Sequence, residues 1–210
     1  MIKNDYIIRN EKAEDYPKTE NLVREAFWNV YKPGCDEHYV LHCMRGDSAF
    51  IPQLDFVMEK DGQIIGQIVF AKAEIAKDDG CVKAVLTFGP VCIHPHYRGM
   101  GYAGILLNYA LENAAEYGDA VFIEGDIGFY SKFGFGFAAD YGIRYHGLPR
   151  GEDSSFFLCK ELKKDCLENI TGEYSTPQIY FSAMENPEDF EKYESAFPYK
   201  EKLVLPGQLG

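Results

Sequence analysis

The chain has 210 residues, enough to bury the core of one large domain, and its 46% hydrophobic content with 15 Phe and 15 Tyr excludes a disordered protein. Its formal net charge is -12 and it has no block of Lys or Arg, so we expect neither nucleic acid nor an anionic membrane as a partner. No stretch approaches the roughly 20 apolar residues that span a bilayer, and the first residues have no apolar signal core, which predicts a cytoplasmic protein.

Two helices are predicted first. The longer one covers about Glu14 to Tyr31 and ends at Pro33-Gly34, and the second covers Glu37 to Met44. The second carries two histidines one turn apart, next to two cysteines: Cys35, His38, His42 and Cys43. No further pair of ligands follows at zinc-finger spacing, so we expect ordinary helix-face histidines and no metal. The six cysteines show no CxxC spacing and are expected to be thiols.

A meander of three antiparallel strands is predicted next. Residues 54–60 and 63–75 flank Asp61-Gly62, which is the strongest short hairpin signal. A second turn at residues 77–80 leads into a third strand over residues 81–93. This strand contains Gly89-Pro90, and because proline cannot donate to a sheet ladder, an interruption of the pairing is expected there.

A crossover follows the meander. Helical spacing of apolar residues from Ala103 to Ala114 predicts a helix, and residues 120–124 predict a strand that returns parallel to the preceding one. One more strand is predicted within residues 154–162. The tail from Lys163 is polar, with one or two amphipathic turns in residues 189–197. The fold class is therefore α/β with a mixed α+β sheet: an antiparallel meander followed by a strand-helix-strand crossover.

The start of the crossover helix carries the chemistry. Most helices begin with a side chain that caps the first amides, but this one begins Arg98-Gly-Met-Gly-Tyr-Ala-Gly104. Uncapped amides, close approach at the glycines and the positive end of the helix dipole together favour a bound phosphate, to which Arg98 can add a contact. A tight turn that needs positive φ would explain the glycines equally well.

A dinucleotide site is the competing interpretation. Gly99, Gly101 and Gly104 also satisfy G-x-G-x-x-G, and Glu124 follows about 20 residues later, where a ribose-binding acid would lie. An NAD(P)-binding oxidoreductase would begin with its βαβ unit, however, whereas an antiparallel meander precedes these glycines. The loop from His94 to Arg98 also separates the strand from the glycines. We therefore rank this alternative low.

Two ordered motifs resemble those of the GNAT family of N-acetyltransferases. Residues 88–111 are similar to its acetyl-CoA-binding motif, through Ile93, Pro95, Tyr97, Arg98, Gly99, Gly101 and Ala103. Some thirty residues later, a second motif is matched by Phe129, Tyr130, Gly134 and Phe135. The resemblance covers about residues 10–162 and extends to a bacterial branch of predicted acetyltransferases with a C-terminal extension. It implies a GNAT-like domain over residues 1–162 and an extension over 163–210 that packs on the same domain.

The resemblance implies acetyl-CoA as cosubstrate. A bulge at Gly89-Pro90 would separate two strands, so that Val91, Cys92 and Ile93 bind the pantetheine arm like an added strand. The pyrophosphate would lie on Arg98, Gly99, Met100, Gly101, Tyr102, Ala103 and Gly104. Many members have an Asn several residues before the motif tyrosine; here Ile123 occupies that place, so this contact is absent or is replaced by one from Asp126.

The catalytic residues are harder to assign. Acetyl transfer needs a neutral amine to attack and a thiolate to leave, and Tyr130 is the candidate proton donor to that thiolate. No carboxylate lies in residues 87–93, so Glu124 and Asp126 are the nearest candidates for a base. Each could equally be a helix cap or a loop acid, and a base that acts through water is the other option. His94 and His96 flank Pro95 on a turn and are expected to be surface residues.

The acceptor that these features imply is a primary amine of a small molecule or peptide. The alternative function is a catalytically silent acyl-CoA-binding sensor or interaction module, which would keep the glycine segment without using Tyr130. Neither the identity of the acceptor nor the oligomeric state follows from the sequence, and a homodimer is one option.

Overall fold

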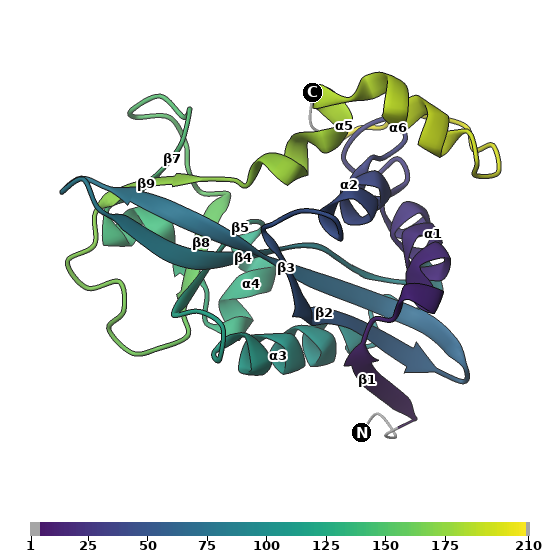
Figure 1. The fold of residues 1–210 in the computed structure, drawn as a ribbon, viewed down its shortest axis with the longest axis horizontal. Coiled ribbons are helices and arrows are strands. Elements are labelled where there is room, and N and C mark those ends of the chain that lie inside the picture. Colours follow the sequence, from purple (N-terminus) through teal and green to yellow (C-terminus); the bar gives the residue numbers. More distant parts are fainter. Residues whose placement is uncertain (1–4, 209–210) are drawn as a thin grey trace. The chain divides into compact units, whose positions relative to one another are not determined.

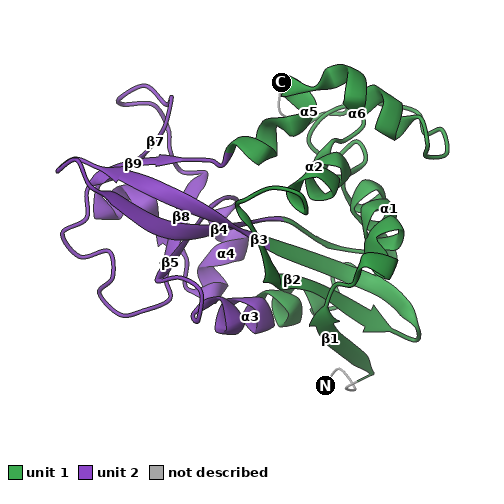
Figure 2. Ribbon diagram, viewed as in Figure 1, with its two compact units in different colours: residues 1–69, 90–107, 178–210 green, residues 70–89, 108–177 purple. Residues whose placement is uncertain are grey.

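The computed structural model describes residues 5–208, which group into two compact units (Figures 1 and 2). Among the described residues, unit 1 comprises residues 5–69, 90–107 and 178–208, and unit 2 comprises residues 70–89 and 108–177. The strands pair in the order β1-β2-β3-β4-β5-β8-β6, and β9 pairs with β3 and β7. Parallel and antiparallel pairs both occur, which confirms the predicted mixed α/β fold.

Unit 1 begins with an antiparallel pair. Strand β1 (Tyr6–Asn10), which the sequence analysis did not predict, runs along β2 (Phe50–Lys60), with Tyr6 opposite Lys60. Strand β3 (Gln63–Lys77) follows through Asp61 and Gly62, whose φ angles of 50° and 75° are those of the hairpin turn that this dipeptide favours. The predicted hairpin is therefore confirmed.

Helices α1 (Tyr16–Phe27) and α2 (Glu37–Met44) also belong to unit 1. The predicted α2 is confirmed, but the prediction that the first helix reaches Tyr31 is wrong. The chain leaves the helix at Trp28, and Asn29 has a φ of 60° while its Oδ1 accepts a hydrogen bond of 2.7 Å from the amide of Gly34. Val30 keeps helical spacing in the sequence, yet it lies in this loop with 40% of its surface exposed.

Strand β4 (Val82–Ile93) continues through Gly89 and Pro90, so the strand itself is unbroken, and the interruption of pairing expected at these residues stays a prediction. Gly89 adopts a φ of 151°, which lies in the region that favours glycine. The parallel ladder between β4 and β5 (Ala120–Glu124) is short. In the described part of the chain it is recorded at one position, Leu86 opposite Val121, three residues before Gly89.

Unit 2 holds the second half of the crossover. Helix α3 (Tyr102–Ala114) contributes residues to both units and connects β4 to β5, as predicted. Strand β8 (Phe157–Glu161) is antiparallel to β5, and β6 (Gly136–Phe137) is antiparallel to β8. Buried aromatic rings fill this side of the sheet, with the rings of Phe122 and Tyr174 5.5 Å apart.

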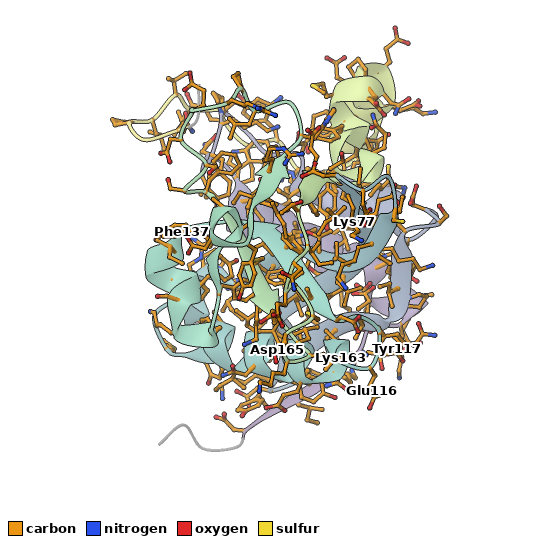
Figure 3. All side chains as sticks on the ribbon, turned by 90° about the vertical axis from the view of Figure 1, so that its left-hand side faces the viewer. Lys77, Glu116, Tyr117, Phe137, Lys163 and Asp165 are labelled. Atoms are coloured by element: carbon orange, nitrogen blue, oxygen red, sulfur yellow. The ribbon has the colours of Figure 1, made fainter. Side chains whose placement is uncertain are left out.

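The rest of the chain is divided between the two units. Strand β7 (Ile143–Tyr145) is parallel to β9 (Gly172–Ser175), which also pairs with the end of β3. Figure 3 shows the side chains and labels Lys163 and Asp165, which follow β8 in the sequence. Short helices α4 (Ile127–Tyr130) and α5 (Ser182–Glu185) precede α6 (Pro187–Glu194). Single 3-10 turns lie at Ala13–Asp15, Pro95–Tyr97, Ser131–Phe133, Ala138–Tyr141 and Gln178–Phe181.

Residues beyond 162 do not form a separate unit. Residues 163–177 belong to unit 2 and residues from 178 onward to unit 1. The boundary at residue 162 stays a prediction. Within residues 5–208, no helix combines the length and the apolar character that crossing a bilayer requires.

Candidate functional site

The glycine segment forms an exposed turn at the start of α3, in unit 1. Gly99 and Gly101 have φ angles of 74° and 88°, a conformation that other residues rarely adopt. The backbone here is accessible, because residues 98–101 are exposed and a Cβ on Gly99 would meet no atom within 4 Å. The turn therefore requires glycine for its conformation and leaves space beside it for a ligand.

The amides at this turn are free to bind an anion. The first backbone bond at this end of α3 runs from the Ile105 N–H to the Gly101 carbonyl over 3.3 Å. In the part of the chain that the structure describes, the N–H groups of Tyr102, Ala103 and Gly104 have no recorded acceptor. Uncapped amides at a helix N-terminus bind phosphate through hydrogen bonds and through the helix dipole. These observations fit the pyrophosphate site predicted from the sequence.

Residues Val91 to Ile93 form the end of β4 that leads into this turn. The backbone here is fixed against β3, because the amide of His94 donates to the Ile65 carbonyl over 2.7 Å. The side chain of Ile93 occupies the space above Gly66, where a Cβ would come within 2.6 Å of Ile93 Cδ1. Cys92 is buried, and this burial raises the pKa of its thiol to about 12. Cys92 is therefore a protonated thiol and no candidate nucleophile.

Arg98 has a partner that the sequence did not indicate. Its Nη2 donates to the backbone carbonyl of Ala26 in the last turn of α1. This bond holds the glycine turn against α1 in unit 1. A guanidinium has five N–H donors, so the remaining ones stay able to contact a phosphate. Arg98 can thus position the turn and bind an anion at the same time.

Tyr130 ends helix α4 in unit 2, where its ring is held by other aromatic rings. The ring centroids of Phe129, Phe135 and Phe88 lie 5.0, 5.5 and 6.1 Å from that of Tyr130. Gly125 provides space for the ring, because a Cβ there would lie 2.5 Å from Tyr130 Cε2. The ring is therefore held in one position, as a residue that must present a hydroxyl requires.

The two candidate acids, also in unit 2, both have structural partners. Asp126 is the N-cap of α4, with its Oδ1 accepting from the amide of Gly128 over 2.9 Å. Glu124 is exposed at the end of β5 and accepts from the hydroxyls of Tyr145 at 2.6 Å and Thr176 at 3.0 Å. A capping role for these acids is compatible with the sequence alone, but hydroxyl donors 21 and 52 residues away from Glu124 leave no local signal in it.

The predicted residues thus fall into two groups. The proposed CoA-binding residues, Val91–Ile93 and Arg98–Gly104, lie in unit 1, whereas Tyr130, Glu124 and Asp126 lie in unit 2. A cavity of about 320 Å³ in unit 2 contains none of them. It is lined by Asp140, Tyr141, Glu161, Asp165, Leu167, Glu168 and Asn169.

Comparison with known proteins agrees with this geometry. The Acetyltransferase (GNAT) domain matches residues 53–136, which run from within β2 past α4 and include both motifs. The uncharacterized N-acetyltransferase YhbS of Escherichia coli K12 is 29% identical over 167 residues, which cover 79% of this chain and 93% of that protein.

Solved structures of GNAT-family acetyltransferases are also similar to this chain. The crystal structure of Escherichia coli YhbS in complex with CoA has a TM-score of 0.72 at 29% identity, covering 84% of this chain and 92% of that one. A GNAT-family acetyltransferase from Brucella melitensis in complex with acetyl-CoA shares the fold, with a TM-score of 0.65 at 24% identity over 83% of this chain and 97% of that one. These relatives support an acyl-CoA-dependent acetyltransferase. The chain is similar to the GNAT family of N-acetyltransferases, through the family model over residues 53–136 and through YhbS.

Proposed function

We propose that the protein transfers the acetyl group of acetyl-CoA to a primary amine of a small molecule or peptide. The observation that carries this proposal is the exposed turn at Gly99 to Gly104, where the amides at the start of α3 have no recorded acceptor among the described residues. This donor set fits a pyrophosphate. The CoA in the YhbS crystal structure is a second support, since YhbS shares this fold at 29% identity.

In this proposal, each group of residues has one task. The amides of residues 99–104, with the free donors of Arg98, bind the pyrophosphate, and the backbone of Val91 to Ile93 binds the pantetheine arm. The short β4–β5 ladder supports this second role, because strands that separate leave backbone groups unpaired. Tyr130 gives its phenolic proton to the leaving thiolate, which its motif position and its fixed ring support. Glu124 or Asp126 would attract the cationic amine.

Turnover distinguishes this proposal from a silent acyl-CoA sensor. The purified protein is incubated with acetyl-CoA and a panel of polyamines, aminoglycosides, amino acids and peptides, and free thiol is measured. The proposal predicts thiol release that depends on both acetyl-CoA and one class of amine. Binding of CoA without thiol release for any amine would favour the sensor, and binding of NADH without CoA would favour an oxidoreductase.

A further inference from the structure

Glu37 is a carboxylate of unit 1 to which no role has been assigned so far. It is the first residue of α2, is half-buried, and its Oε2 accepts from the amide of Asp36 over 3.1 Å. No Lys, Arg or His side chain forms an ion pair with it among residues 5–208. A half-buried carboxylate without a cationic partner is costly, and this cost is reduced when a cation or a proton binds.

Three other carboxylates on or beside helices α1 and α2 are already paired. Glu20 accepts from Arg45 and from the Tyr193 hydroxyl at 2.8 Å, and Glu194 lies between Arg24 and His38. Asp36 pairs with Lys32. Glu37 differs from all of them because its hydrogen-bond donors are backbone amides alone. Its charge therefore remains available to an incoming ammonium.

Glu37 also acts on the strand proposed to hold pantetheine. Burial is the largest cause of the raised pKa of the Cys92 thiol; the charge of Arg98 lowers this pKa and the charge of Glu37 raises it, so both charges act on the middle residue of Val91–Ile93. Two contacts hold the chain before Glu37 in place. Arg98 donates to the Ala26 carbonyl, and the Sγ of Cys35 lies 3.7 Å from the Arg24 carbonyl. The end of α1, the start of α2 and the end of β4 thus form one cluster.

We propose that Glu37 is the catalytic base of the transfer, which removes a proton from the ammonium group of the acceptor beside Val91–Ile93. This inference rests on the proposed function. The titratable and charged groups that interact with Glu37 are Lys32, Asp36, Cys35 and Cys92. Arg24 and Glu194 also act on Cys35, and Arg98 also acts on Cys92.

The protons balance in this step. The Glu37 carboxylate takes one proton from R–NH3+, and the nitrogen lone pair then attacks the acetyl carbonyl carbon. The new C–N bond forms, the C–S bond breaks, and the leaving thiolate takes a proton from its donor, Tyr130. The nitrogen then loses its second proton, which returns to Tyr130, and protonated Glu37 releases its proton to solvent. The products are the N-acetyl amide, CoA and one proton.

The protonation behaviour of Glu37 suits this task. Burial, which is the largest cause, and the charge of Asp36 raise the pKa of Glu37 to about 6, against opposing effects of backbone amides and Lys32. A base with a pKa near neutrality is ionised at pH 7 and still accepts a proton readily. The enzyme should therefore lose activity as the pH falls through about 6.

The test compares Glu37→Gln and Glu37→Asp with the parent, using the amine that gives the fastest thiol release. At pH 7 the kcat/KM of Glu37→Gln should fall by about 10²-fold or more, the usual contribution of a general base. This variant needs amine that is already neutral, so its rate should rise with pH and approach that of the parent at alkaline pH. Glu37→Asp keeps a carboxylate, so it should still lose activity at acidic pH, and its kcat/KM should be lower than that of the parent. Calorimetry should show unchanged CoA affinity in both variants.

Glu14→Gln is the matched control, because Glu14 is exposed on the same unit and its one recorded ion pair is with Lys12. A second readout uses carbon-13-labelled glutamate and NMR, in which the resonance missing from Glu37→Gln should titrate near pH 6. A parent-like kcat/KM in Glu37→Gln, or titration of Glu37 at the ordinary carboxyl pKa of 4.5, would overturn this inference and leave the proposed function in place. Failure of the parent to bind CoA or to release thiol with any amine would overturn the proposed function as well.

Discussion

The guanidinium of Arg24 lies 2.5 Å from the carboxylate of Glu194, although 170 residues separate them in the sequence. The same carboxylate lies 2.8 Å from Nε2 of His38. Arg24 is on α1, His38 on α2 and Glu194 on α6, and Arg24 has 1% of its side chain exposed. One carboxylate therefore connects α6 to both helices, and the three aromatic rings of Phe190, Tyr193 and Phe197 pack around His38.

Replacing Glu194 with Gln should strongly destabilise unit 1. The change leaves the buried Arg24 charge without an anion, which costs about 3 kcal/mol or more. Denaturant unfolding should show a lower midpoint with an unchanged m-value. Glu188→Gln, on the exposed first turn of the same helix, is the control and should match the parent. Equal midpoints for the two variants would show that the buried pair contributes nothing.

The stability of the protein should depend on the protonation of His38. Burial is the main cause that lowers the pKa of this side chain to about 4, against the opposing effect of Glu194. The folded state thus binds fewer protons here than the unfolded state, so this stability is present above about pH 6.5 and is lost as the pH falls through 4. His38→Gln should remove this part of the pH dependence. Parallel curves of unfolding free energy for parent and variant between pH 7 and 4 would contradict the assignment.

Asp55 should have the opposite pH dependence. Burial and then the neighbouring Glu11 raise the pKa of this carboxyl well above its ordinary value, and 2% of the residue is exposed. The folded state therefore binds the proton more tightly, and stability falls as the pH rises above the ordinary carboxyl range. Asp55→Asn should thus gain stability relative to the parent between pH 5 and 8. A constant difference across that range would show that Asp55 ionises normally.

Short sequence patterns predicted the elements whose conformation depends on neighbouring residues, such as turns and amphipathic helices. Asp61-Gly62 gave the hairpin because both residues tolerate positive φ, and the apolar spacing of residues 103–114 gave α3. Gly99 and Gly101 turn out to need positive φ and also to leave amides accessible, so the two interpretations of the glycines are compatible.

Long-range pairing explains what the sequence could not give. Strand β9 pairs with β3 across about 100 residues, and its four residues carry too short a pattern to be recognised. Val30 continued the helical spacing of α1, but the side chain of Asn29 closes a loop that no periodicity reveals. No local pattern marks Glu37 as a base, because its raised pKa comes mainly from burial, which only the folded chain determines.

Tyr130→Phe tests the proposed proton donor. The ring and its packing against Phe88, Phe129 and Phe135 stay, and only the hydroxyl is removed. A phenol with an ordinary pKa near 10 stays protonated at neutral pH and can donate to a leaving thiolate. We expect kcat to fall by roughly 10² to 10⁴-fold with acetyl-CoA affinity nearly intact. Turnover at the parent rate would mean that solvent protonates the thiolate.

Calorimetric titration of CoA into Gly101→Val tests the central claim most directly. Valine at a φ of 88° is strained, and its side chain would occupy the approach to the amides at the start of α3. Gly80→Val is the matched control, because Gly80 has a φ of 86° in the turn between β3 and β4 and no atom lies within 4 Å of a Cβ there. The account predicts that Gly101→Val loses CoA binding while Gly80→Val keeps the affinity of the parent. Parent-like affinity in Gly101→Val would contradict the assignment of the pyrophosphate to this turn.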